Sequence, residues 1–247
     1  MSRRSSVTRL SDHDLTEREY RTTDRLSQRR LDRTGWLRGK DERLLALQAL
    51  AAIGPSRVLD AGCGTGDFAA LIAAPEVLCV DSSEAAVKAT EAKGLTARVA
   101  DVQDLPYPDG YFDAVACNWV LHHVPDRRKA IAEFARVLTP SGRFVGCYNA
   151  PDHLGALWSA LALGDDADDF NSANGPGELA ESFATVEVRE VWGQVLWEER
   201  DALQTYLDAY SELYGPLSAP DVSYPFRAAR HNVVFVADRP RTQGARP

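Results

Sequence analysis

The sequence predicts an α/β fold in which helices cover both faces of a mostly parallel sheet. Between residues 56 and 149, short apolar runs of strand length alternate with helical patterns of about ten residues. This alternation is typical of repeated strand–helix–strand units. A turn with three alternate glycines follows the first apolar run, and polar residues follow several later runs. Since ligands bind at the carboxyl ends of parallel strands, these residues also predict where a site would lie.

The expected elements of this region follow one another closely. A first helix has apolar residues at helical spacing from Leu44 to Ile53 and stops at Gly54 and Pro55, which terminate helices. Five strands and three helices are expected next. The strands are 57–61, 77–81, 97–100, 112–120 and 142–148, and the helices are 68–74, 83–93 and 127–138.

After residue 149 the pattern is less regular. Two further strands, separated by a helix, would extend the edge of the sheet. The expected elements are a helix at 154–163, a loop at 174–177, a strand at 186–196, a helix at 201–214 and a strand at 232–237.

The chain is expected to form one main domain with flexible ends. Residues 1–33 hold nine Arg against six Asp and Glu and lack a regular apolar pattern, which indicates a solvated basic arm. The expected divisions are an arm at 1–35, a domain at 36–238 with its core at 56–149 and lid or substrate elements at 150–183 and 197–230, and a disordered tail at 239–247.

Composition argues against several classes of protein. Apolar residues make up 45% and charged residues 26% of the 247 residues, as in a globular protein with a core. No apolar run approaches the roughly 18 residues of a membrane helix, and no secretory signal follows Met1. The net charge of −8 disfavours a nucleic-acid surface. We therefore expect a cytoplasmic protein without nucleic-acid or membrane partners, and the sequence leaves its oligomeric state open.

The cysteines and histidines predict no metal centre. The four cysteines never form a C-x-x-C pair, and three of them lie in apolar runs that predict buried strands. The five histidines show no H-E-x-x-H or comparable spacing. Buried thiols, without a disulfide framework, are the expectation.

The strongest motif is the glycine-rich turn within residues 58–68. A strand that runs into G-x-G-x-G and then a helix lets the backbone pass close to a ligand. The dinucleotide fingerprint G-x-G-x-x-G would need glycine where this chain has Asp67, which disfavours an NAD enzyme. Asp60, just before the first glycine, would repel a pyrophosphate but suits a cationic ligand.

This run resembles motif I of the class I methyltransferases that use S-adenosylmethionine (SAM), and residues 56–148 are similar to their type 11 family. The resemblance implies a Rossmann-like three-layer sandwich with a seven-stranded, mostly parallel sheet and helical lid elements. It also implies SAM as the cofactor.

The resemblance assigns cofactor roles to residues that follow the strands. Asp81 would accept hydrogen bonds from both ribose hydroxyls, although it could instead cap the helix from Ser83, as Ser82 could equally well. Asp101 and Val102 would bind the adenine edge, although an ordinary Asp turn explains them too.

The methionine part of SAM would lie nearer the glycine turn. The resemblance implies that the backbone near Asn118 holds its amino group, together with a glycine carbonyl of motif I. Trp36 and Arg38 are expected to close over the cofactor as a lid, with the guanidinium meeting its carboxylate. The candidate cofactor-binding residues are Arg38, Asp60, Gly62, Cys63, Gly64, Gly66, Asp81, Ser82, Asp101, Val102, Asn118 and Trp119.

His122 and His123 are the candidate catalytic residues. A neutral imidazole can take a proton from an attacking hydroxyl or amine at neutral pH. Either residue could instead cap a helix or order the loop, and SAM carries so good a leaving group that no base need be essential.

The function that these residues predict is transfer of a methyl group to O, N or C of a small-molecule acceptor, as in specialised metabolism. Substrate contacts are expected from residues 36–38, from 148–158 and from the helix with Tyr206, Tyr210 and Tyr214. Two alternatives remain. A SAM enzyme of the same fold could catalyse a reaction without methyl transfer, or the chain could be a non-catalytic interaction protein, which the intact glycines and aspartates disfavour.

Overall fold

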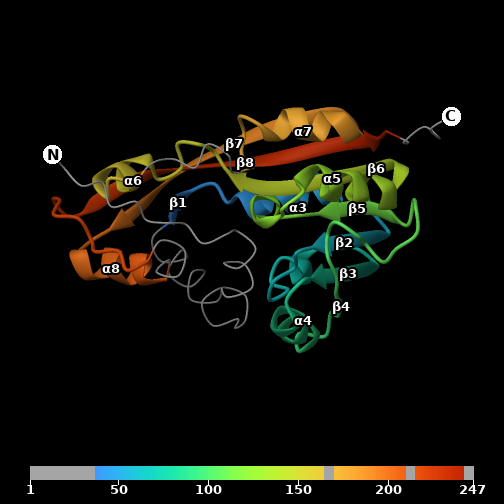
Figure 1. Ribbon diagram of the computed structural model, residues 1–247, viewed down its shortest axis with the longest axis horizontal. Helices are drawn as coiled ribbons and strands as arrows, with labels where there is room; N and C mark the ends of the chain where they lie inside the picture. The colour runs from blue at the N-terminus through green and yellow to red at the C-terminus, as the bar shows by residue number, and fades with distance from the viewer. Residues whose placement is uncertain (1–36, 164–169, 210–214, 242–247) are drawn as a thin grey trace.

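The computed structural model describes residues 37–163, 170–209 and 215–241 (Figure 1). The strands are β1 (Leu37–Gly39), β2 (Arg57–Ala61), β3 (Glu76–Asp81), β4 (Thr96–Val99), β5 (Phe112–Ala116), β6 (Leu138–Asn149), β7 (Phe183–Trp197) and β8 (Phe226–Pro240). The α-helices are α3 (Glu42–Ala51), α4 (Glu84–Glu91), α5 (Arg127–Val137), α6 (Gly155–Ala160), α7 (Gly175–Ser182) and α8 (Arg200–Asp208), and two 3₁₀ turns are η1 (Ala69–Leu71) and η2 (Leu121–His123).

All of these strands belong to one sheet, of order β1-β7-β8-β6-β5-β2-β3-β4. The neighbours from β6 to β4 pair in parallel, whereas β8 is antiparallel to both β6 and β7. Strand β7 therefore runs in the same direction as β6. The expected seven-stranded, mostly parallel sheet is confirmed, with the short β1 added at one edge, antiparallel to β7.

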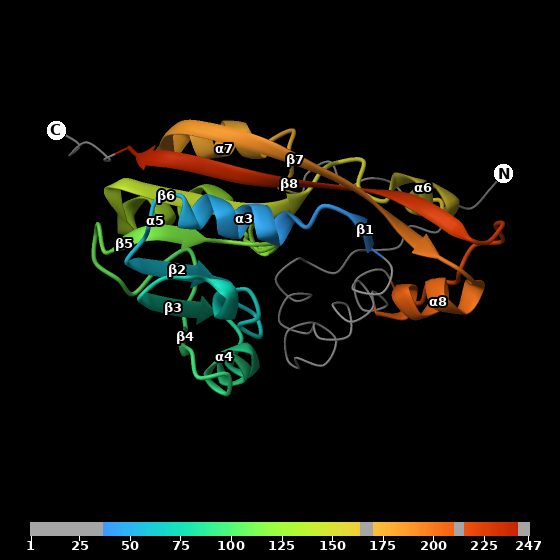
Figure 2. The ribbon, with the colours of Figure 1, turned by 180° about the vertical axis from the view of Figure 1, so that it is seen from behind.

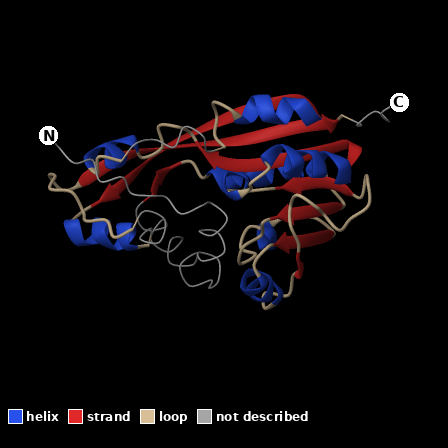
Figure 3. Ribbon diagram, in the orientation of Figure 1, coloured by secondary structure: helices blue, strands red, loops and turns tan. Residues whose placement is uncertain are grey.

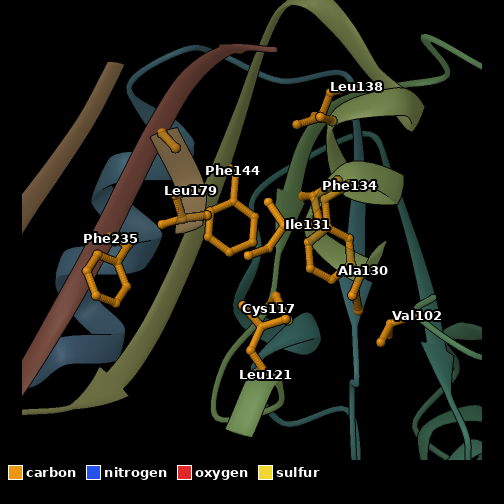
Figure 4. Packing of buried hydrophobic residues seen from close by; sticks show 14 of the residues in the cluster. Val102, Cys117, Leu121, Ala130, Ile131, Phe134, Leu138, Phe144, Leu179 and Phe235 are labelled. Atoms are coloured by element: carbon orange, nitrogen blue, oxygen red, sulfur yellow. The ribbon is translucent and has the colours of Figure 1, made fainter. Parts of the chain in front are cut away.

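Helices cover both faces of this sheet. In Figure 1, α5 and α7 lie in front of the strands, and the reverse view in Figure 2 brings α3 to the front. Two apolar clusters fill the two interfaces. Ile131, Phe134 and Leu179 pack on Phe144 and Phe235 in the first of them, which Figure 4 shows from close by. The second cluster joins α3, together with Phe68 and Ile72 on either side of η1, to the other face. The three-layer arrangement is visible in Figure 3.

The β7–β8 hairpin extends beyond the carboxyl edge of the parallel strands. Strand β6 ends at Asn149, opposite Asn232, but the pairing of β7 with β8 continues as far as Trp197 and Phe226. Helices α6 and α8 lie at this far end of the hairpin (Figures 1 and 2). They form a separate apolar cluster with Trp197. The carboxyl edge of the sheet therefore faces a second packed unit of the same chain.

The structure corrects several boundaries. The helix expected at 68–74 is only the 3₁₀ turn η1, because β3 begins at Glu76 and Pro75 disfavours helical geometry in the residue before it. The loop expected at 174–177 opens helix α7, in whose first turn Pro176 is well tolerated. Strand β8 runs to Pro240, two residues into the segment expected to be a disordered tail.

Two expected elements are shorter than their sequence patterns. The strand at 112–120 ends at Ala116, and α8 ends at Asp208. Residues 210–214 of the helix expected at 201–214, with Tyr210 and Tyr214, lie outside the described residues. The arm at 1–35 and residues 164–169 of the lid elements expected at 150–183 lie outside the described residues. Of the helices that are described, none is long and apolar enough to cross a membrane.

Candidate active site

The glycine turn leaves β2 at the carboxyl edge of the sheet. Gly62, Gly64 and Gly66 all adopt positive φ, at 77°, 54° and 75°, where residues with a Cβ are strained. A Cβ atom at Gly62 would lie 2.2 Å from Val120 Cγ2, whereas a Cβ atom at Gly64 would meet nothing within 4 Å. The turn is therefore pressed against the segment that follows β5 and is open at Gly64, where a ligand can approach the backbone.

Asp81 ends β3 and joins this strand to the glycine turn. One carboxylate oxygen accepts a hydrogen bond from Gly64 N at 2.8 Å, and the other accepts one from Ser83 N at 2.9 Å. The N-cap of α4 is Ser83, whose hydroxyl accepts from Ala86 N. The alternative in which Asp81 or Ser82 caps this helix is therefore wrong.

Burial alters the acidity of Asp81. The residue is 8% exposed, and desolvation raises the pKa of its carboxyl above 3.8, although the N–H groups of Ser83, Gly64 and Ser82 oppose the rise. The carboxylate keeps lone pairs beyond those used by these N–H groups, so it can accept further hydrogen bonds from a ligand.

Asp60 and Cys63 lie inside the fold on either side of the first glycine. Asp60 is 2% exposed and in register with Cys79 of β3 and Ala116 of β5. Contact with the Cys79 thiol and burial both raise the pKa of the Cys63 thiol. Since a thiol in that state is a poor nucleophile, Cys63 packs the turn rather than reacting.

Asp101 and Val102 follow β4 at the same edge of the sheet. The Asp101 carboxylate accepts a hydrogen bond from Gln103 N at 2.8 Å and two from Gln103 Nε2, at 3.1 and 3.0 Å. This is the Asp turn that the sequence left as an alternative. Asp101 remains exposed, whereas Val102 is buried in the core beneath α5.

Asn118 and Trp119 continue the pairing of β5 with β6 past the end of β5. Asn118 Oδ1 accepts from Cys147 N at 2.9 Å, and Trp119 N donates to Cys147 O at 3.0 Å. Asn118 Nδ2 is buried without a hydrogen-bond partner among the described residues. Trp119 adopts a left-handed φ of 54°, and its Nε1 donates to Asn149 Oδ1 at 3.2 Å.

His122 and His123 form the 3₁₀ turn η2 just after these residues. Their rings lie 3.9 Å apart, centre to centre, and His122 meets the ring of Tyr148 edge-on at 6.5 Å. Both imidazoles are half-buried at the carboxyl edge, in the position expected from the sequence. Their catalytic role stays a prediction.

The remaining candidates are further from the glycine turn. Arg38 lies in β1, in register with Gln194 of β7, which places its backbone on the hairpin extension. Its side chain, like Trp36, lies outside the described residues. Tyr206 is 8% exposed and packs against Trp197, so this tyrosine belongs to the core of the extension.

Sequence reasoning missed a group of polar side chains where β6 and β8 meet. Asn149 Oδ1 also accepts from Asn232 Nδ2 at 3.2 Å. On the opposite face, His231 Nδ1 bonds Asp152 Oδ1, and its ring stacks on Trp192 at 3.6 Å. Asn149 and Asp152 fall in the segment 148–158 that the sequence did favour for substrate contacts. No sequence signal pointed to Asn232 or His231, which only the antiparallel pairing of β8 with β6 brings to this edge.

Neither these residues nor the other described ranges contain three or more His, Cys, Asp or Glu side chains placed to hold a metal ion. The expectation of a metal-free protein stays a prediction.

Comparison with known proteins finds methyltransferases that are similar in sequence to the segment that carries this site. Residues 59–146 match the family described as "Methyltransferase domain". The chain is 41% identical over 121 residues to a demethylmenaquinone methyltransferase of Deinococcus radiodurans, covering 45% of this chain and 48% of that protein. It is 40% identical over 98 residues to a 27-O-demethylrifamycin SV methyltransferase of Amycolatopsis mediterranei, covering 35% of this chain and 36% of that protein. The chain thus spans about half or less of the length of these relatives.

The fold is also similar to that of solved methyltransferases. A solved SAM-dependent methyltransferase from Thermotoga maritima superposes with a TM-score of 0.53 at 18% identity, over 80% of this chain and 89% of the other. At that identity the likeness concerns the fold alone. The resemblance to the type 11 methyltransferases that the sequence showed is confirmed for the segment 59–146.

Proposed function

We propose, from the methyltransferase domain that residues 59–146 carry, that this chain transfers the methyl group of SAM to a small-molecule acceptor. The observation that supports it most strongly is the pair of buried carboxylates around the glycine turn. Asp60 precedes the turn, and Asp81 holds its middle residue, Gly64, which is open to a ligand. A cationic ligand suits the Asp60 carboxylate beside the turn, whereas the pyrophosphate of a dinucleotide does not, and the Asp81 carboxylate is placed to accept hydrogen bonds from a ribose.

In this proposal each part of the cofactor meets a different strand end. Asp81 accepts hydrogen bonds from the ribose hydroxyls, with the exposed Ser82 beside it. Asp101 and Val102 flank the adenine, and the turn from Gly62 to Gly66, which includes Cys63, lies beneath the sulfonium. Asn118 and Trp119 meet the methionine part, and the buried Asn118 Nδ2 supports this, because it is a donor in need of an acceptor such as a carboxylate.

Bound SAM supplies a methyl group activated by the positive sulfur. A bond forms from the acceptor atom to the methyl carbon while the carbon–sulfur bond breaks, and its electron pair stays on sulfur in S-adenosylhomocysteine. The protein aligns the acceptor with that bond and excludes water, which supplies most of the acceleration. The proton of the acceptor passes to His122 or His123, in the turn η2 that follows Asn118 and Trp119 in the chain, or to solvent.

The acceptor in this proposal is a small molecule, as the names of the quinone and rifamycin relatives state for those proteins. The four cysteines, all free and buried, support a reducing, cytoplasmic setting. The net charge of −8 supports the absence of nucleic acid as a partner.

A labelled transfer assay tests the reaction. SAM with a deuterated methyl group is incubated with the full chain and a set of hydroxylated and amino aromatic compounds, and products are analysed by mass spectrometry. The expected result is a labelled product formed together with an equal amount of S-adenosylhomocysteine. Turnover of a compound without release of S-adenosylhomocysteine would instead indicate a SAM-fold enzyme that does not transfer the methyl group.

A further inference from the structure

Two side chains donate hydrogen bonds to one oxygen atom of a third, Asn149, at the carboxyl edge. Asn149 Oδ1 accepts hydrogen bonds from Trp119 Nε1 and from Asn232 Nδ2, both at 3.2 Å. An indole N–H only donates, so the amide of Asn149 must present its oxygen to Trp119. Its NH₂ group is thereby turned away from both partners. Since Asn149 is exposed, these two N–H donors lie at the surface of the edge.

Asn232 and Trp119, which orient Asn149, each have a feature that destabilises the fold. Asn232 is 2% exposed, and its own Oδ1 is buried without a hydrogen-bond partner among the described residues. A buried, unpaired acceptor destabilises a fold. Trp119 holds a left-handed φ of 54°, which is strained for a residue with a large side chain. Folds retain strain and unpaired polar atoms mainly where a ligand depends on the group that they position.

Asn149 also lies within reach of the glycine turn. Strands β2, β5 and β6 are neighbours in the sheet, so the ends of β2 and β6 are two strand spacings, about 10 Å, apart. A methyl group held near the end of β5 would face an acceptor that rests on the end of β6.

We infer that the Asn149 amide binds a carbonyl-type oxygen of the methyl acceptor, beside the atom that is methylated, and that Asn232 and Trp119 are positioning residues. This inference rests on the proposed methyl transfer. Two N–H donors select an oxygen with free lone pairs. The half-buried indole of Trp119 adds an aromatic surface beside them, which favours a flat, conjugated molecule. The acceptor class is therefore a planar ring that carries a carbonyl next to the atom that is methylated, and a ring with a hydroxyl at that place is the form used as a probe.

Calorimetric titration of the full chain, saturated with S-adenosylhomocysteine, tests this class. The probes are 2-hydroxy-1,4-naphthoquinone, which has a hydroxyl next to a carbonyl, and 2-naphthol, which has the hydroxyl alone. We expect Asn149→Asp, which keeps the accepting oxygen but removes the N–H donors, to weaken binding of the hydroxyquinone about tenfold or more. Asn232→Leu should have a similar effect, because it releases the Asn149 amide. Binding of 2-naphthol should change less than about threefold.

The controls separate this inference from the proposed function. Gln48→Leu removes an exposed amide from α3 and should leave both probes unaffected. Affinity for S-adenosylhomocysteine should stay within about twofold in every variant, which also reports that each is folded. If the cofactor product binds but the hydroxyquinone does not, or binds equally to the wild type and Asn149→Asp, the inference is overturned while methyl transfer stands. If the cofactor product itself does not bind, the proposed function fails first.

Discussion

At the end of β3, the carboxylate of Asp81 is buried beside the glycine turn and accepts a hydrogen bond from Gly64 of that turn. Burial favours the neutral carboxyl, whereas the N–H groups of Gly64 and Ser83 favour the charged form. Because desolvation is the larger effect, this group becomes protonated at a higher pH than an exposed aspartate. A ribose, which donates to the carboxylate, binds the charged form.

We therefore predict that affinity for S-adenosylhomocysteine decreases as the pH is lowered. The decrease should begin at a pH above 3.8, the ordinary pKa of an aspartate. The sign follows from the raised pKa, because protonation removes the charged acceptor as pH falls through that pKa. Titration calorimetry across the acidic range measures the change. Asp81→Asn should bind about 1.5–3 kcal/mol more weakly at neutral pH and show no such pH dependence. Equal affinity and an equal pH profile in both proteins would remove Asp81 from the cofactor site.

Gly62 gives a second prediction at the scale of one residue. Gly62→Ala introduces a Cβ atom 2.2 Å from Val120 Cγ2, at a φ of 77°, and should lower the free energy of unfolding by about 2 kcal/mol or more. Gly54→Ala is the matched control, because its φ is 56° but a Cβ atom there meets nothing within 4 Å. Urea unfolding of both variants measures the difference. Equal destabilisation would show that strain at positive φ, and not contact with Val120, requires glycine.

The sequence predicted these site residues where a local pattern carried the information. The glycine turn and the polar residue after each strand are local signals, and the structure brings Asp60, Asp81 and Asn118 to one edge as expected. Asn232 had no such signal. Its place beside Asn149 depends on pairing between strands more than eighty residues apart in the chain, and no local pattern in the sequence specifies that pairing.

Among the elements, α3 is attached to the sheet by a buried ion pair. Glu42 in its first turn and Arg230 on β8 are 7% and 6% exposed by side chain and bond one another. The pair fixes the start of α3 against the hairpin at the carboxyl edge. Because two charges are desolvated together, removal of one leaves the other buried and uncompensated.

We predict that Arg230→Met lowers the free energy of unfolding by about 3–5 kcal/mol. The double variant Glu42→Leu, Arg230→Met should recover much of this loss, because no charge then remains buried. Chemical denaturation of the two single variants and the double variant gives the coupling energy. Additive effects of the two changes would mean that the residues do not act as a pair.

Element types were predicted better than element ends. The strands from 57 to 148 have the expected order because their apolar runs are continuous and bounded by turns. Pro75 shortens the helix expected at 68–74 to the turn η1. Strands β7 and β8 are longer than their apolar patterns because their antiparallel pairing also includes polar residues. Tertiary pairing decides these ends, and the local pattern does not.

In the whole molecule, the carboxyl edge of the parallel sheet is the proposed cofactor site, and the β7–β8 hairpin extends beyond that edge. The extension has its own apolar cluster, with α6 and α8 packed around Trp197 (Figure 1). The family match covers 59–146 and ends before the extension begins. In our proposals the shared part binds the cofactor, and the acceptor is bound where β6 ends and the extension begins, at Asn149 and Asn232.

The central claim is that the carboxyl edge around Gly64 and Asp81 binds SAM and not a dinucleotide. Titration calorimetry of the full chain with S-adenosylhomocysteine, and separately with NAD, tests it most directly. The account predicts a dissociation constant on the order of micromolar for S-adenosylhomocysteine, about −8 kcal/mol, and no measurable binding of NAD. Binding of NAD that is tighter than binding of S-adenosylhomocysteine would contradict it.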